Sequence, residues 1–380
     1  MPWLIVAGDL TPLGGMDAAN HALARYLAAR DEVHLVTHRA WPDLAALPSV
    51  TLHRVWRPLN RHLLGSPLLA RAGQRVWRRL RSSTAQAVVN GGNCRIACAN
   101  WVHYLHAANP VSTNSTGGSV ARRAKAALTH RRDLIAERRA LRSARIIICN
   151  SRRTRDDVIE RIGVDPARVH VIYYGGDPVR FSLVNPDERA AARAALSQPA
   201  GRPLVGFVGA LGDRRKAFDT LFSAWCELCR SPEWDADLIV VGEGAKRPAW
   251  QCRAREAGIG DRIRFVGFRT DVPEILAALD ALVHTARYEA YGLSVREALC
   301  RGVPAVVSAS AGVAEHYPPE RAGLLIADPD DPAELRATLL VWRRDMEGFR
   351  AAIVPLSAAL RSRTWDAMAE QITECVLRLT

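Results

Sequence analysis

The chain has 380 residues, of which 48% are hydrophobic and 24% are charged. This length predicts two globular domains, because one hydrophobic core rarely serves more than about 250–300 residues. No apolar run approaches the roughly 18 residues that a membrane-spanning helix needs. The apolar start at residues 3–7 lacks the basic segment and cleavage site of a signal peptide. We therefore expect a cytoplasmic protein, whose eight cysteines are reduced thiols rather than disulfides or zinc ligands.

The excess of positive charge lies entirely in the first half of the chain. Residues 1–180 hold 27 Lys and Arg against 12 Asp and Glu, whereas residues 181–380 hold 25 against 27. This asymmetry favours an anionic or membrane-bound partner for the first half. Binding to nucleic acid would also explain the charge. We do not favour it, because the basic runs lack interleaved aromatic residues and match no known module.

The chain opens with a strand–helix–strand pattern. A strand is predicted at residues 3–7, a helix at 17–29 and a second strand at 32–37. Gly14 and Gly15 lie between the first strand and the helix, where glycine permits a close approach of the backbone to a ligand. A simple turn is the alternative interpretation of the two glycines.

A basic amphipathic segment follows at residues 57–81. Its predicted apolar face carries Leu68, Ala72, Val76 and Leu80, and its basic face carries Arg71, Arg75, Arg78 and Arg79. Such a helix suits an anionic membrane surface or an anionic acceptor. An ordinary solvated face over a core stripe is the alternative. A second basic run, residues 122–145, is also predicted to be helical.

The remainder of the first half alternates apolar runs with polar turns. Residues 95–99 predict a strand with His103 just beyond it, and further strands are predicted at 144–150 and 169–173. The last of these strands leads into Tyr174-Gly175-Gly176-Asp177, and a linker follows at residues 185–201.

The second half begins with a predicted strand at residues 204–208, followed by Gly209 and by the run Arg214-Arg215-Lys216 at the entry of a helix. An Arg and Lys pair in this position can neutralise a diphosphate. Lysine is rare in this chain, with three residues in total, which makes Lys216 a sharp signal. Two further strands, 237–241 and 263–266, end at Gly242 and at Gly267-Phe268.

Residues 281–307 predict a strand, a polar loop, a short helix and another strand. The loop carries Glu289 and Gly292, and the helix, from about Ser294 to Arg301, carries Glu297 in its first turn. Ligands of parallel sheets lie at the carboxyl ends of strands, where helix N-termini favour phosphate and a nearby carboxylate can bind ribose. The segment therefore predicts a nucleotide-diphosphate site. The alternatives are a solvated loop acid for Glu289 and a capping box formed by Ser294 and Glu297.

Glu289 and Glu297, with seven residues between them and with Gly-Val-Pro after the helix, resemble the E-x7-E motif of retaining glycosyltransferases of the GT-B fold, glycosyltransferase family 4. The resemblance covers nearly the whole chain. It implies an α/β protein with two Rossmann-like domains facing across a cleft. We expect an acceptor-side domain at residues 1–182 and a donor domain at 183–380, whose last helix, about 364–380, packs back on the first domain.

The resemblance also assigns roles to residues. Glu289 is expected to hold sugar hydroxyls, Glu297 the ribose, and Arg215 with Lys216 the departing diphosphate, while His103 lies near the sugar. The residues expected to border the donor are Gly14, Gly15, Gly209, Gly242, Gly267, Phe268, Gly292, Leu293 and Ser294. Four positions depart from the family pattern: Ala210 replaces an Arg, Ala217 and Ala311 replace glycines, and Tyr174 replaces an Asn.

The implied function is transfer of a sugar, with retention of configuration, from a nucleotide-sugar to a glycan or lipid-linked acceptor in cell-envelope or exopolysaccharide synthesis. We expect a UDP-sugar rather than a GDP-sugar, and no divalent metal, because Arg215 and Lys216 would do the job that a metal does in other glycosyltransferases. The protein would be cytoplasmic, with peripheral membrane contact through the basic first domain. A sugar-nucleotide epimerase or hydrolase of the same fold, and a non-catalytic relative, are the alternatives.

Overall fold

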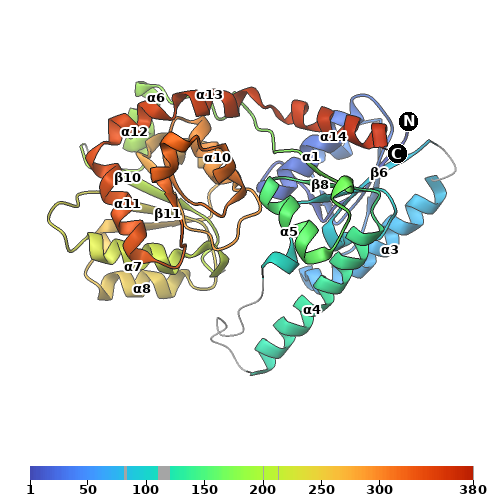
Figure 1. Ribbon diagram of the computed structural model, residues 1–380, viewed down its shortest axis with the longest axis horizontal. Helices are drawn as coiled ribbons and strands as arrows, with labels where there is room; N and C mark the ends of the chain where they lie inside the picture. Colours follow the sequence, from blue (N-terminus) through green and yellow to red (C-terminus); the bar gives the residue numbers. More distant parts are fainter. Residues whose placement is uncertain (81–83, 110–119, 200, 213, 380) are drawn as a thin grey trace. The chain divides into compact units, whose positions relative to one another are not determined.

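The computed structural model describes residues 1–80, 84–109, 120–199, 201–212 and 214–379 (Figure 1). The chain divides into two compact units. The first comprises Met1–Gly175 and Thr364–Thr380, and the second comprises Gly176–Arg363. The boundary between the two units, at Gly175 and Gly176, lies a few residues before the expected domain boundary at 182/183.

The first unit is built on a seven-stranded parallel sheet with the strand order β5-β3-β1-β6-β7-β8-β9. Three of its strands, β1, β7 and β8, are buried along their whole length, as expected for a sheet covered on both faces, whereas the edge strand β5 has no buried residue. They are β1 (Trp3–Val6), β3 (Val33–Thr37), β5 (Val50–Arg54), β6 (Gln86–Asn90), β7 (Ala99–Val102), β8 (Ile146–Cys149) and β9 (Val169–Val171). A small parallel pair, β2 (Asp9–Leu10) and β4 (Arg39–Ala40), accompanies this sheet. The strand order reverses direction between β1 and β6, which is where such sheets place their ligands.

The helices of this unit are α1 (Gly15–Ala28), α2 (Pro42–Ala45), α3 (His62–Leu80), α4 (Val120–Ser143), α5 (Arg152–Ile162) and α14 (Trp365–Leu379). The last helix, α14, packs on α1, as the family resemblance implies. Two predictions needed correction. Strand β7 begins at Ala99, where the predicted strand ended, because Trp101 and Val102 are fully buried. The buried face of α3 is formed by Gly65, Leu69, Gly73 and Val76, so of the predicted stripe Val76 is buried, while Leu68, Ala72 and Leu80 are half-buried.

The second unit contains a six-stranded parallel sheet with the order β12-β11-β10-β13-β14-β15. Its strands are β10 (Leu204–Val208), β11 (Asp237–Val241), β12 (Ile263–Gly267), β13 (Ala281–His284), β14 (Ala305–Ser308) and β15 (Leu325–Ile326). Here the order reverses between β10 and β13. The loops that follow these two strands carry Lys216 and Glu289, so the topology alone brings the two predicted site residues to one place.

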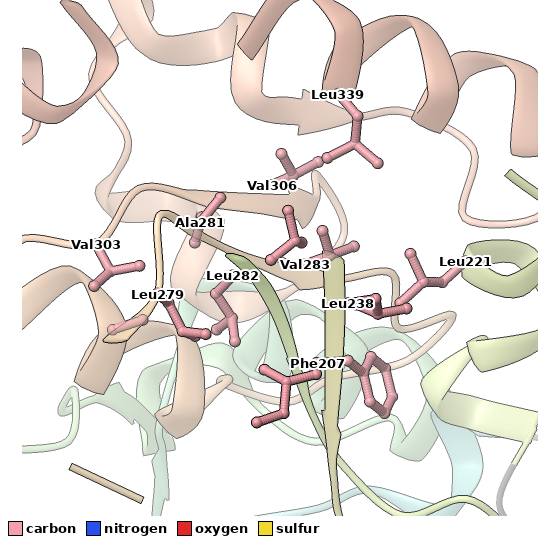
Figure 2. Close-up of a cluster of buried hydrophobic side chains, with 14 of the residues drawn as sticks. Phe207, Leu221, Leu238, Leu279, Ala281, Leu282, Val283, Val303, Val306 and Leu339 are labelled. Atoms are coloured by element: carbon pink, nitrogen blue, oxygen red, sulfur yellow. The ribbon is translucent and has the colours of Figure 1, made fainter. Parts of the chain in front are cut away.

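The helices of the second unit are α6 (Pro186–Ala195), α7 (Phe218–Leu228), α8 (Arg247–Glu256), α9 (Val272–Ala278), α10 (Leu293–Cys300), α11 (Pro332–Arg344), α12 (Met346–Ala352) and α13 (Val354–Ser362). They cover both faces of the sheet (Figure 1). Figure 2 shows the core between these layers, where Phe207, Leu282 and Val306 from the strands lie near Leu221 of α7 and Leu339 of α11. This packed layer holds the strand ends, and hence the loops beyond them, in fixed positions.

All eight cysteines are free thiols; four are buried, whereas Cys226, Cys229 and Cys375 are half-buried and Cys252 is exposed. Within the described parts of the chain, none of the helices is long and apolar enough to cross a membrane.

Candidate functional site

The loop after β10 and the loop after β13 are joined by hydrogen bonds to backbone carbonyls of the first loop. The Thr285 hydroxyl donates to the carbonyls of Lys216 and Ala217, at 3.3 and 3.0 Å. The Arg287 amide donates to the Arg215 carbonyl at 2.8 Å. The short 3₁₀ segment Arg214–Lys216 is therefore held against the strand end that leads to Glu289.

Glu289 lies at the centre of a compact charged cluster. Its carboxylate is ion-paired with Lys216 Nζ and lies 3.4 Å from Arg215 Nη1. The Nε2 atom of His284, the last residue of β13, is 3.3 Å away. Burial raises the pKa of Glu289, but Lys216, His284 and Arg215 together hold it well below its usual value. The group is therefore a carboxylate at neutral pH, so it can accept hydrogen bonds from a polyol.

Of the two arginines that could replace the guanidinium missing at Ala210, the structure brings Arg215 into the cluster. Arg215 also donates to the Tyr288 carbonyl at 3.2 Å, whereas Arg214 is exposed. His284 is a member that the sequence analysis missed. Its signal was a polar residue that ends an otherwise apolar strand. Burial and Lys216 lower the pKa of His284, so its ring is neutral at pH 7.

The N-terminus of α10 lies directly beyond Glu289 in the chain. Gly292 caps the helix at a φ of 110°, and a Cβ there would come within 2.9 Å of Val313. The first intrahelical donors are the amides of Val295 and Arg296, both bonded to the Gly292 carbonyl. The amides of Leu293 and Ser294 precede them, in the positions where a helix N-terminus binds anions.

Glu297 lies one turn into α10 and is half-buried. The capping-box interpretation is wrong, because Gly292 and not Ser294 is the N-cap and no side chain caps this helix. Burial raises the pKa of Glu297 to about 7, although Arg296 and Arg180 oppose the rise. The carboxyl group thus changes charge near neutral pH.

Three predicted glycines bring the loops after β10, β11 and β12 together. A Cβ on Gly242 would lie 1.9 Å from the Gly209 carbonyl oxygen, so the two backbones touch. The Gly242 amide in turn donates to the Gly267 carbonyl at 2.8 Å. Phe268, which follows, is 67% exposed and can lie against a planar ligand. The packing requires glycine at position 242, and the φ of 77° favours glycine at position 267, whatever else these residues do for a ligand.

The family departures have different local consequences. Ala217 adopts a left-handed conformation, with φ 49° and ψ 38°, that glycine tolerates better. Ala311 has an ordinary φ of −79°, so this position does not require glycine.

In the first unit, His103 is at the centre of a buried network of neutral groups. Its Nδ1 contacts the Tyr174 hydroxyl, and its Nε2 lies 2.9 Å from Asn90 Nδ2 and 3.3 Å from Asn20 Oδ1. Asn150 donates to the same Tyr174 hydroxyl at 3.2 Å. Burial lowers the pKa of His103 to about 3, so the ring is uncharged. Tyr174, which replaces the expected Asn, thus completes the shell around His103.

Gly14 and Gly15 form the N-terminus of α1 in the same unit. Gly14 caps the helix at a φ of 85°, which favours glycine, although a Cβ would meet no atom within 4 Å. The arginines at positions 71, 75, 78 and 79 on α3 are exposed, as predicted. Among the described residues, no three His, Cys, Asp or Glu side chains are grouped so as to hold a metal ion.

Two family models match the chain and together cover most of it. Residues 13–180 match the model described as glycosyltransferase family 4, and residues 202–345 match the model described as glycosyl transferases group 1. A curated relative is the 2-deoxystreptamine N-acetyl-D-glucosaminyltransferase of Streptomyces fradiae, 29% identical over 305 residues, which are 79% of this chain and 66% of that protein. The chain spans about half to two thirds of the length of the curated relatives it matches.

Solved structures show the same fold along the whole chain. WaaG, a glycosyltransferase involved in lipopolysaccharide biosynthesis, matches 99% of both chains with a TM-score of 0.78 and 20% identity. HepE of Anabaena in complex with UDP-glucose matches 100% of both chains with a TM-score of 0.72 and 19% identity. The expected α/β fold with two Rossmann-like halves is therefore confirmed.

Proposed function

Because the chain belongs to the glycosyltransferases of group 1 and family 4, we propose that it is a retaining glycosyltransferase that uses a nucleotide-sugar donor. The observation that carries this proposal is the Glu289 cluster with Arg215 and Lys216. It lies where the strand order reverses, in the loop just before the N-terminus of α10. The second unit thus contains a carboxylate that can bind a sugar, two cations that can bind a diphosphate, and free helix amides.

The chemistry follows from the charges that develop when the anomeric bond breaks. The departing phosphate gains negative charge, which Arg215, Lys216 and the amides of Leu293 and Ser294 stabilise. Glu289 binds the sugar hydroxyls and Glu297 binds the ribose. The acceptor hydroxyl attacks on the face that the diphosphate leaves and passes its proton to the departing phosphate oxygen, so the anomeric configuration is retained. The two cations serve the role of a divalent metal, so we expect activity in the presence of a chelator.

We propose a UDP-sugar as the donor. The supporting observation is that the related HepE structure contains UDP-glucose. The loop at Gly267 and Phe268 is expected to border the base, and Glu297 the ribose. Phe268 offers an exposed ring to the base, as stacking requires.

For the acceptor we propose an anionic or lipid-linked glycan, reached at the inner face of the cell membrane. The support is the exposed basic face of α3 and the exposed apolar side chains of Trp56 and Leu59 just before it, which together suit an anionic bilayer surface. Reversing Arg71, Arg75 and Arg78 to Glu should abolish binding to anionic liposomes. The matched control reverses Arg230, Arg255 and Arg344, which are exposed on the second unit, and should bind like wild type. Unchanged liposome binding by the α3 variant would contradict the proposed contact with the membrane.

A small cyclitol is a second candidate acceptor, because the Streptomyces fradiae relative is a 2-deoxystreptamine N-acetyl-D-glucosaminyltransferase. Transfer to a cyclitol without any lipid or glycan would support this alternative.

The test of the donor site is a thermal-shift panel of UDP-, GDP-, ADP- and TDP-sugars with wild type and Glu297→Ala. A ligand that binds the native state raises its apparent stability. We expect a shift with UDP-sugars that Glu297→Ala loses, and NMR of the product should show the donor's anomeric configuration. Turnover without acceptor would favour an epimerase or hydrolase. If no nucleotide shifts the wild type, a non-catalytic relative becomes the better explanation.

A further inference from the structure

His284 is a buried histidine at the end of β13, the strand that leads into the loop with Glu289. It is the one polar residue of that strand, and its side chain is 2% exposed. In the part of the chain that the structure describes, its Nε2 atom makes no hydrogen bond, although the atom is buried. A buried polar atom without a partner is costly. The Nε2 atom is therefore expected to gain a partner in another state of the site.

The protein's contacts with Glu289 all go to one of its two carboxylate oxygens. Lys216 Nζ is ion-paired with Oε2, while Arg215 Nη1 lies 3.4 Å and His284 Nε2 3.3 Å from the same atom. Among the described residues, none donates to Oε1, and the Glu289 side chain is 14% exposed. The protein thus holds Glu289 by Oε2, and Oε1 is the oxygen that a ligand can reach.

The three partners of Oε2 differ in their freedom to move. Lys216 and Arg215 have long side chains, 14% and 19% exposed, which can turn toward a diphosphate. His284 is enclosed and stays where it is. The facing carboxylate selects the tautomer of His284 that carries its proton on Nε2, because a lone pair there would be repelled. When Lys216 leaves Oε2, this N–H is the donor next to the oxygen, and its missing hydrogen bond can form.

We propose that His284 is a positioning residue for Glu289: it holds Oε2 when Lys216 and Arg215 engage the diphosphate, and so keeps Oε1 directed at the sugar hydroxyls. The inference rests on the proposed function, because it takes Glu289 as the sugar ligand and the two cations as diphosphate ligands. A neutral donor suits this position. A third cation would be repelled by Lys216 and Arg215, and an apolar side chain would leave the carboxylate unheld.

The test separates binding of the sugar from binding of the diphosphate. Calorimetry measures the affinities of UDP and of the UDP-sugar that gives the largest thermal shift, for wild type, His284→Leu and His284→Gln. His284→Leu should bind UDP within about twofold of wild type but lose most of the affinity that the sugar adds. Its kcat should fall about 10- to 100-fold, because the sugar is no longer held in place. His284→Gln, whose amide reaches the position of Nε2, should recover most of both.

The control is Thr285→Val, at the next position in the chain. The Thr285 hydroxyl donates to the carbonyls of Lys216 and Ala217, so its loss disturbs the diphosphate side of the cluster. This variant should weaken UDP and the UDP-sugar by the same factor. If His284→Leu does not fold, His284→Asn takes its place, because its amide ends short of the Nε2 position; it should lose the sugar's contribution where His284→Gln keeps it.

A double variant tests whether His284 acts through Glu289. In a Glu289→Ala background, His284→Leu should have no further effect on affinity for the UDP-sugar. A loss that persists in that background, an equal loss of UDP and UDP-sugar affinity, or wild-type behaviour of His284→Leu would overturn the inference while leaving the proposed function intact. If the wild type binds neither UDP nor any UDP-sugar, the proposed donor falls and this inference falls with it.

Discussion

Each unit places polar side chains at the carboxyl edge of its own parallel sheet. These side chains form a charged cluster in the second unit and a neutral network in the first. In the second unit, Glu289 is surrounded by Lys216, Arg215 and His284, and the ion pair with Lys216 leaves both side chains 14% exposed. In the first unit, His103 is enclosed by neutral amides and a phenol. A ligand can therefore displace a side chain from the partly exposed Glu289 cluster more readily than from the enclosed network around His103.

This difference suits the Glu289 cluster to binding a ligand and the His103 network to fixing the backbone around it. A partly exposed carboxylate between two cations is ready for a diphosphate and a sugar, because either cation can turn from Glu289 to a phosphate. A satisfied network of neutral groups instead fixes the backbone that carries it. Its ring nitrogens already have protein partners, so a direct contact of His103 with the sugar requires one of them to be given up. The expected role of His103 near the sugar stays a prediction.

The largest effect should come from Lys216→Ala, which removes the cation nearest Glu289. Loss of one preorganised group that stabilises a developing oxyanion lowers kcat about 10²- to 10³-fold. Steady-state kinetics with the preferred donor would measure it. Lys125→Ala, an exposed lysine on α4, is the matched control and should be fully active. Wild-type turnover by Lys216→Ala would place the diphosphate elsewhere.

A smaller effect is expected on stability from Glu289→Gln. At pH 7 the variant leaves Lys216 and Arg215 without their counter-charge, which should lower the free energy of unfolding by about 1–3 kcal/mol. Because the folded-state pKa of Glu289 is depressed, its contribution is complete above the ordinary value of 4.5 and is lost as the pH falls through the folded-state value. Urea unfolding should therefore show the two proteins converging in acid.

Glu243→Gln is the control for this measurement, because its pair with Arg247 is on the surface and Glu243 is 51% exposed. A surface pair contributes about 0–1 kcal/mol. An equal loss in both variants would show that the Glu289 cluster is not specially stabilised.

The neutral network around His103 predicts that the free energy of unfolding changes in a different pH range. The pKa of His103 is about 3 in the folded protein, below its ordinary value of 6.5. The unfolded chain therefore binds one more proton at this residue in acid, so His103 alone should reduce the stability of the wild type by about 1.4 kcal/mol per pH unit below 6.5, or about 2 kcal/mol by pH 5. His103→Gln should reduce this slope in urea unfolding at pH 7 and pH 5. Tyr174→Phe removes one hydrogen bond but not the titration, so it should keep the slope. Equal slopes in wild type and His103→Gln would contradict the prediction.

Sequence patterns found the elements of both sites but not all of their contacts. The strand at Ala281–His284 and the helix carrying Glu297 were predicted within a residue or two, since apolar runs and glycine or proline stops are local signals. That Lys216 meets Glu289 follows from strand order, which the family resemblance supplied. The contact of Tyr174 with His103 depends on packing between elements distant in sequence, and the contact of His284 with Glu289 depends on the path of the loop between them; no spacing rule encodes either one.

The smallest effect is expected at Ala217, where the family pattern has glycine. Its left-handed backbone costs an L-residue about 1–2 kcal/mol. Ala217→Gly relieves this strain but loses a buried methyl group, so the two effects nearly cancel. Ala224→Gly, at an equally buried position inside α7, loses the methyl group and helix propensity with no strain to relieve. We therefore expect Ala217→Gly to be about 1–2 kcal/mol more stable than Ala224→Gly in urea unfolding, with unchanged nucleotide affinity. Equal destabilisation would mean that the loop carrying Lys216 relaxes at no cost, and the charged cluster would then be less rigid than its contacts imply.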